Sequence, residues 1–105
     1  MSKSITFSTH VLDTATGSPA PDIPIVLEPD DGPALRGTTD VHGRFNAAEA
    51  LEPGEYELSF HLAGHFGSAP HLSDRVSVRL RLEGRRHYHV PLLISPFGFA
   101  SYRGS

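Results

Sequence analysis

The chain has 105 residues, which fits one domain over 1–105, and its lack of cysteine excludes disulfides, thiolate metal ligands and a cysteine nucleophile. Its net charge of −3 comes with scattered basic residues, so we expect no nucleic-acid partner. No apolar run is long enough to span a bilayer or to form a signal segment, so we expect a cytoplasmic protein without a membrane partner.

Ten glycines and nine prolines indicate many turns and favour an all-β fold. Apolar and polar residues alternate over 5–11, which predicts a half-buried strand and places His10 on the face away from the core. A turn over 13–19 leads to a short strand over 23–28, in which Pro24 indicates a strand start or a sheet edge.

The middle of the chain predicts three more strands. Two of them, over 35–39 and 44–47, flank a turn at His42 and Gly43, and we expect them to form a hairpin. The third, over 55–62, has one of the clearest alternations in the chain.

The segment 64–74 breaks the alternation and leaves room for one short helix after the fifth strand. A sixth strand over 76–82 follows, and its polar face carries Arg79 and Arg81. We interpret these two arginines as a solvated strand face, whose charge also discourages pairing along the sheet edge.

A strand over 86–95 places Tyr88 and Val90 on one face and His87 and His89 on the other. One proline interrupts this strand and a second ends it, before a last strand near the end of the chain. About eight short strands separated by turns predict a two-sheet β-sandwich.

Two runs resemble the opening and closing signatures of the transthyretin-like 5-hydroxyisourate hydrolase family. They are THVLDTATGSPA at 9–20 and HYHVPLLISPFGFASYRGS at 87–105. The Gly43-Arg44 pair also stands where the family has its internal Gly-Arg. His42 stands where the family usually has Asp, and we expect the turn to close on Gly43 nonetheless.

The resemblance implies a transthyretin-like sandwich with one sheet ordered fourth, first, seventh and eighth strand. It also implies a homotetramer with active sites at the dimer–dimer interface and no cofactor. The implied activity is hydrolysis of the small molecule 5-hydroxyisourate to 2-oxo-4-hydroxy-4-carboxy-5-ureidoimidazoline in urate degradation.

The site residues that the resemblance implies fall into two groups. The catalytic residues are His10, Arg44 and His89, and the substrate-binding residues are Tyr102, Arg103, Gly104 and Ser105. Hydrolysis of a cyclic acyl–nitrogen bond needs a base for water, an acid for the leaving nitrogen and a cation for the oxyanion. We therefore expect the two histidines to be the acid–base pair and Arg44 the oxyanion group, with Arg103 as a second anchor. Which histidine is the base stays open.

Other interpretations of the histidines are a metal site and simple structural roles. Two imidazoles at His87 and His89 can chelate zinc, but no cysteine or neighbouring carboxylate accompanies them, and we expect no required metal. We interpret His61, His65 and His71 as structural or solvent-exposed.

Two other functions compete with hydrolysis. A non-enzymatic transthyretin-type carrier would need an apolar ligand channel, whereas the residues that match the family signatures are polar. An immunoglobulin-like interaction module predicts no concentration of histidine and arginine on matched strand faces.

Overall fold

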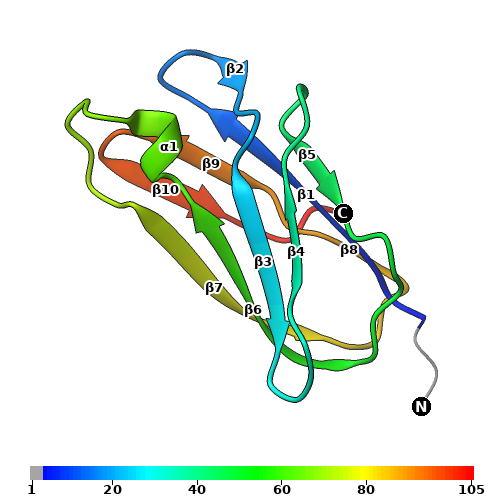
Figure 1. Cartoon of the computed structure of the whole chain (residues 1–105). Coiled ribbons are helices and arrows are strands. Elements are labelled where there is room, and N and C mark those ends of the chain that lie inside the picture. Colours follow the sequence, from blue (N-terminus) through cyan, green and yellow to red (C-terminus); the bar gives the residue numbers. More distant parts are fainter. Residues whose placement is uncertain (1–3) are drawn as a thin grey trace.

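The computed structural model describes residues 4–105, which form ten strands and one short helix (Figure 1). The strands are β1 Thr6–Asp13, β2 Ser18–Pro19, β3 Pro24–Pro29, β4 Leu35–Thr38, β5 Arg44–Asn46, β6 Gly54–His61, β7 Arg75–Leu82, β8 His87–His89, β9 Leu92–Ser95 and β10 Gly98–Ser101. The helix α1 is Ala63–Phe66, and none of the described residues forms a helix long and apolar enough to cross a membrane. There are more than eight strands because β2 lies in the predicted turn over 13–19 and because the strand predicted over 86–95 is divided.

Two sheets pack face to face, which confirms the predicted sandwich (Figure 1). In the first sheet β1 pairs antiparallel with β2 and β5 and parallel with β8 and β9, and β10 pairs with β9. The second sheet is antiparallel, in the order β4-β3-β6-β7. The order β5, β1, β8 with β9, then β10 confirms the sheet order that the family resemblance implied.

The predicted hairpin of the third and fourth strands is wrong, because β4 pairs with β3 and β5 pairs with β1 in the other sheet. The turn between them is closed locally, since Oδ1 of Asp40 accepts hydrogen bonds from the backbone N–H groups of His42 and Arg44, both at 2.9 Å. The Phe45 ring lies so close to Gly37 that a Cβ there would be 2.2 Å away. The two strands therefore meet through a side chain inside the sandwich rather than edge to edge.

The predicted proline interruption is confirmed, and it divides one strand into β8 and β9. The parallel register to β1 is the same on both sides of the break, since Ser8 lies opposite His89 and Val11 lies opposite Leu92, each 81 positions apart. Pro91 has no N–H to continue the ladder. Instead, Oγ1 of the buried Thr9 donates to the Val90 carbonyl at 2.6 Å, which keeps the strand attached to β1.

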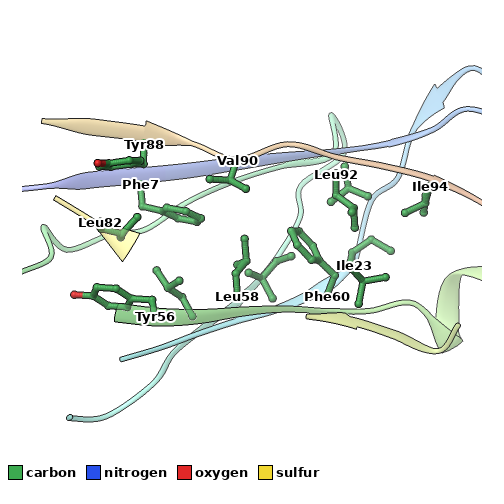
Figure 2. Packing of buried hydrophobic residues seen from close by; sticks show 14 of the residues in the cluster. Phe7, Ile23, Tyr56, Leu58, Phe60, Leu82, Tyr88, Val90, Leu92 and Ile94 are labelled. Carbon is green, nitrogen blue, oxygen red and sulfur yellow. The ribbon is translucent and has the colours of Figure 1, made fainter. Parts of the chain in front are cut away.

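The core lies between the two sheets (Figure 2). Phe7, Tyr88 and Val90 point inward from the first sheet toward Leu58 and Phe60 of the second. Because alternate residues of a strand face opposite sides, the inward position of these residues directs the intervening side chains of β1 and β8 outward. The predicted outward face of His10, His87 and His89 is confirmed, with His10 and His89 half-buried and His87 exposed.

The predicted short helix is confirmed as α1, a single turn directly after β6. Gly67 ends it in the left-handed region at φ 59°, and its N–H donates to the Ala63 carbonyl at 2.8 Å. Nε2 of His65 lies 2.7 Å from Oδ2 of Asp13, which ties the helix to the end of β1. His65 is thus structural, as predicted.

The arginines of β7 are exposed, as predicted, but they also form ion pairs. Arg79 contacts Asp30 at 2.6 Å and Arg81 contacts Glu55 at 2.6 Å. Exposed pairs of this kind contribute about 0–1 kcal/mol each. Pro24 is the first residue of β3, so the predicted strand start is correct, whereas β3 is an interior strand and not an edge.

Candidate active site

The outer face of the first sheet gathers the predicted catalytic residues on three neighbouring strands. His10 of β1 lies directly opposite Arg44 of β5, and Ser8 of β1 lies directly opposite His89 of β8. Ser8 and His10 are two residues apart and so share one strand face. Directly opposed residues have Cβ atoms about 4.5–5.5 Å apart. The structure therefore brings His10, Arg44 and His89 together, although they are far apart in the sequence.

The turn before β5 orients His10. Nε2 of His10 donates a hydrogen bond to the His42 carbonyl at 2.8 Å. A carbonyl only accepts, so Nε2 carries the proton and the neutral imidazole has its lone pair on Nδ1. The contact uses the backbone of residue 42, which explains why His in place of the family's usual Asp is compatible with this site.

Gly43 allows this turn to lie directly on β1. Its φ of 76° is in the left-handed region, and a Cβ at this position would be 2.5 Å from the Val11 carbonyl oxygen. Its own carbonyl accepts a hydrogen bond from the Val11 N–H at 2.7 Å. The predicted closure of the turn on Gly43 is confirmed.

His89 is half-buried and contacts Ser8 of β1. Its Nδ1 is 2.8 Å from Oγ of Ser8, which is 3.1 Å from Nε2 of His87. Burial lowers the pKa of His89, and repulsion from the protonated forms of His10 and His87 and from Arg44 lowers this pKa further. The imidazole of His89 is therefore neutral near neutral pH.

Ser8 and His87 were not among the predicted site residues. The sequence signal for them is their spacing, because each lies two residues before one of the predicted histidines and so shares its strand face. Sequence alone gave no sign that a serine hydroxyl lies between the two imidazoles. Within residues 4–105, no three histidine or carboxylate side chains are grouped closely enough to hold a metal ion.

The C-terminal tail returns to β8. The Gly104 N–H donates to the His89 carbonyl at 2.7 Å, and the two residues form an isolated antiparallel bridge. A Cβ on Gly104 would lie 2.9 Å from Cδ2 of the His89 ring. The tail backbone therefore packs against the imidazole near Cδ2, and only glycine leaves room for it. Ser105 is exposed beyond this contact.

Tyr102 and Arg103 lie apart from the histidines in the single chain. They line a largely apolar pocket of about 230 Å³, whose other lining residues are Val78, Leu80, Arg81, Leu82, Tyr88, Val90 and Ser101. Tyr88 and Val90 belong to the inward face of the first sheet, opposite to the face of His89. Within one chain, Gly104 therefore lies beside His89, whereas Tyr102 and Arg103 line the apolar pocket on the other side of the sheet.

Comparison with known proteins agrees with this architecture. A model of the HIUase/Transthyretin family matches residues 7–104. The 5-hydroxyisourate hydrolase of Mesorhizobium japonicum is 43% identical, over 93% of this chain and 90% of that protein. The structure of Klebsiella pneumoniae 5-hydroxyisourate hydrolase has a TM-score of 0.86 and 34% identity, covering 96% of this chain and 99% of that chain. Transthyretin from Sparus aurata has a TM-score of 0.76 at 24% identity, covering 93% and 95%, and shows the fold alone. The chain therefore belongs to the HIUase/Transthyretin family.

Proposed function

We propose that this chain hydrolyses 5-hydroxyisourate, a small molecule, in the degradation of urate. The observation that carries the proposal is the strand register, which sets two imidazoles and a guanidinium on one sheet face. Relatives named 5-hydroxyisourate hydrolase match this chain over nearly its whole length, which supports the same activity here. The polar outer face of β1, with Ser8 and His10, argues against the carrier alternative, because a hydrophobic ligand would need an apolar wall.

In the proposed reaction His89 is the base, since its lowered pKa keeps it neutral. His89 accepts a proton from water, and the water oxygen attacks the carbonyl carbon of the cyclic acyl–nitrogen bond. Arg44 stabilises the negative charge that develops on the carbonyl oxygen. The carbon–nitrogen bond then breaks, and the nitrogen leaves with a proton from the imidazolium form of His10. The carboxylic acid that forms loses its proton to the solvent, so the product carries a carboxylate and a freed N–H group, and proton exchange with the solvent returns His89 and His10 to their starting states.

His10 suits the role of acid because its two ring nitrogens have different neighbours. Nε2–H is held by the His42 carbonyl, so Nδ1 is the nitrogen that faces the substrate, and it is Nδ1 of the imidazolium form that carries the proton His10 gives up. Arg44, directly opposite His10, offers a planar guanidinium fork to the carbonyl groups of a urate-like ring. These three side chains supply the base, the acid and the cation that the reaction requires.

We propose that the tail residues Tyr102, Arg103, Gly104 and Ser105 bind the substrate, with Arg103 as a second anchor. Gly104 lies against the His89 ring, which supports this role for the end of the tail. Tyr102 and Arg103 face a different pocket in the single chain, and we propose that they act at a site shared between subunits.

The proposed assembly is a homotetramer with sites at the dimer–dimer interface. Within residues 4–105, β7 and β10 are the last strands of their sheets, and such edges present backbone groups that another chain can pair with. Phe97, Phe99 and Tyr102 are large apolar side chains with more than half of their surface exposed, which is consistent with an interface near β10. Light scattering after size-exclusion chromatography tests the assembly, and a fully active monomer would contradict it. The cytoplasmic location stays a prediction, which cell fractionation would test.

The activity is tested by following the ultraviolet absorbance of freshly generated 5-hydroxyisourate. We expect purified protein to accelerate its disappearance, and His10→Ala and His89→Ala each to lower the rate strongly. His61→Ala is the matched control, because His61 lies at the end of β6 in the other sheet. Wild-type rates in both site variants, with folding checked by circular dichroism, would refute the assignment.

A further inference from the structure

Four side chains on the outer face of β1 and β8 form one continuous series of hydrogen bonds. Oγ1 of Thr6 lies 2.6 Å from Nδ1 of His87, and Nε2 of the same ring lies 3.1 Å from Oγ of Ser8. Oγ of Ser8 lies 2.8 Å from Nδ1 of His89. At the far end, Oγ1 of Thr6 donates to the Arg86 carbonyl at 3.3 Å.

The strand register produces this series. Thr6 lies opposite His87 and Ser8 lies opposite His89, so hydroxyls and imidazoles of two parallel strands alternate along one face. Each hydroxyl has one hydrogen to donate, and each neutral imidazole has one N–H and one lone pair. The series is therefore fully satisfied only if all its hydrogen bonds run in one direction.

We infer the direction from the Arg86 carbonyl, which can only accept and which receives the backbone N–H of Thr6 at 2.9 Å and the hydroxyl of Thr6 at 3.3 Å. Thr6 gives its hydrogen to this carbonyl, so its oxygen accepts from Nδ1–H of His87. Nε2 of His87 then holds the lone pair and accepts from Ser8. The Ser8 oxygen in turn accepts from Nδ1–H of His89. The neutral His89 ring is left with its lone pair on Nε2.

We propose that Ser8 and His87 are positioning residues that hold His89 in its Nδ1–H tautomer, with a basic Nε2 directed at the substrate. This inference rests on the hydrolase function proposed above, and it assigns roles to two residues outside the catalytic set. The partner on one ring nitrogen decides which nitrogen of a histidine is protonated. In the opposite tautomer Nε2 carries a hydrogen and cannot take a proton from water.

The two histidines of the site are thus held in opposite tautomers by different parts of the fold. The His42 carbonyl keeps the hydrogen of His10 on Nε2, whereas Ser8 keeps that of His89 on Nδ1. The imidazoles therefore present different ring nitrogens to the substrate. Gly104 packs against the His89 ring at Cδ2, which limits rotation of the imidazole out of this geometry.

The tautomer is read directly by NMR of protein with ¹⁵N-labelled histidine, using two-bond correlations from ring protons to ring nitrogens. In the wild type above the titration of His89, we expect a protonated Nδ1 and an unprotonated Nε2 at this residue. Ser8→Ala removes the acceptor, and we expect its His89 signals to move toward a mixture of tautomers. Ser8→Thr keeps the hydroxyl and is expected to restore the wild-type pattern.

Kinetics with the same variants separates positioning from binding. We expect Ser8→Ala to lower kcat by about tenfold to a hundredfold with little change in KM, as losses of orienting partners of functional histidines do. His87→Phe is expected to act in the same direction, and Ser8→Thr to recover most of the rate. Ser77→Ala is the control, because Ser77 lies on β7 in the other sheet and shares its hydroxyl contact with Ser59.

Two results would overturn the inference: an Nε2–H tautomer for His89 in the wild type, or wild-type kcat in Ser8→Ala while His89→Ala is inactive. The two experiments also separate this inference from the function on which it rests. An Nδ1–H tautomer in a protein that does not hydrolyse 5-hydroxyisourate would refute the function alone. Hydrolysis by a protein with the opposite tautomer would refute only the positioning role.

Discussion

Gly43→Ala should destabilise the protein far more than the loss of a surface glycine normally does. Gly43 has a φ of 76°, and a residue with a Cβ in the left-handed region costs about 1–2 kcal/mol. The new Cβ would also lie 2.5 Å from the Val11 carbonyl oxygen and 3.1 Å from Cβ of Pro19. The first contact is with backbone, which cannot turn away as a flexible side chain can. Overpacking of this kind costs about 1–3 kcal/mol.

The two effects together predict a loss of about 2–5 kcal/mol in the free energy of unfolding. A loss of about 3 kcal/mol lowers Tm by about 12–24 °C in a domain of this size. Urea denaturation and thermal unfolding, both followed by circular dichroism, measure these quantities. The turn also holds the carbonyl that orients His10, so kcat should fall in the fraction of protein that remains folded.

Gly17→Ala is a matched control for this experiment. Gly17 has nearly the same φ, 75°, but no atom lies within 4 Å of the position of its Cβ. Only the conformational cost applies there, so we expect a loss of about 1–2 kcal/mol. The close approach of the turn to β1 would be refuted if Gly43→Ala and Gly17→Ala lost equal stability.

Three further substitutions and one titration test the site and the core. Gly104→Ala should lower kcat by about a hundredfold with little loss of stability, because the His89 ring must turn away from a Cβ 2.9 Å from its Cδ2. His89 should titrate below its ordinary pKa of 6.5 in an NMR titration, since burial and neighbouring cations lower its pKa. The contribution of His89 to stability should decline as the pH falls below 6.5, because the unfolded chain binds this proton first. Thr39→Val should cost about 2–4 kcal/mol in urea denaturation, because two backbone groups that hydrogen-bond its buried hydroxyl lose their partner. His65→Ala should cost about 1–3 kcal/mol in the same assay, because the buried Asp13 carboxylate loses a hydrogen bond.

Two of these predictions have a matched control variant, and the titration of His89 has its own contrary result. Gly98→Ala is the control for the tail, because its Cβ would make only an ordinary contact of 3.6 Å, and equal kcat in the two glycine variants would contradict the steric argument. Thr38→Val is the control for Thr39→Val, because Thr38 is exposed and its substitution should leave the free energy of unfolding unchanged. A similar loss of stability in both variants would show that the buried hydroxyl of Thr39 is not the cause. A midpoint at or above pH 6.5 for His89 would contradict the effect of burial and neighbouring charge.

Alternation of apolar and polar residues was sufficient to predict the sandwich and the outward face of the histidines. Phe7 and Tyr88 are buried and His10 and His89 are not, because successive side chains of a strand point to opposite sides whatever the strand pairs with. The interruption at Pro91 was also predictable, since a missing N–H is a property of the residue itself.

Strand pairing was not predictable in the same way. The strands now labelled β4 and β5 are neighbours in the sequence and were expected to pair, yet each pairs with a strand of a different sheet. The choice depends on the fit of the Phe45 ring against Gly37 and on the local closure of the turn by Asp40. These contacts form between residues that come together only in the folded chain, and the alternation of apolar and polar residues within a strand carries no information on them.

By itself, the sequence determined the fold class, the family signatures and the strand faces that carry His10 and His89. Only the tertiary structure decided which side chains meet on that face. Ser8 and His87 are 79 positions apart and became hydrogen-bonded neighbours through the parallel register of β1 and β8. Strand faces follow from covalent geometry within a few residues, whereas register follows from the packing of the whole chain.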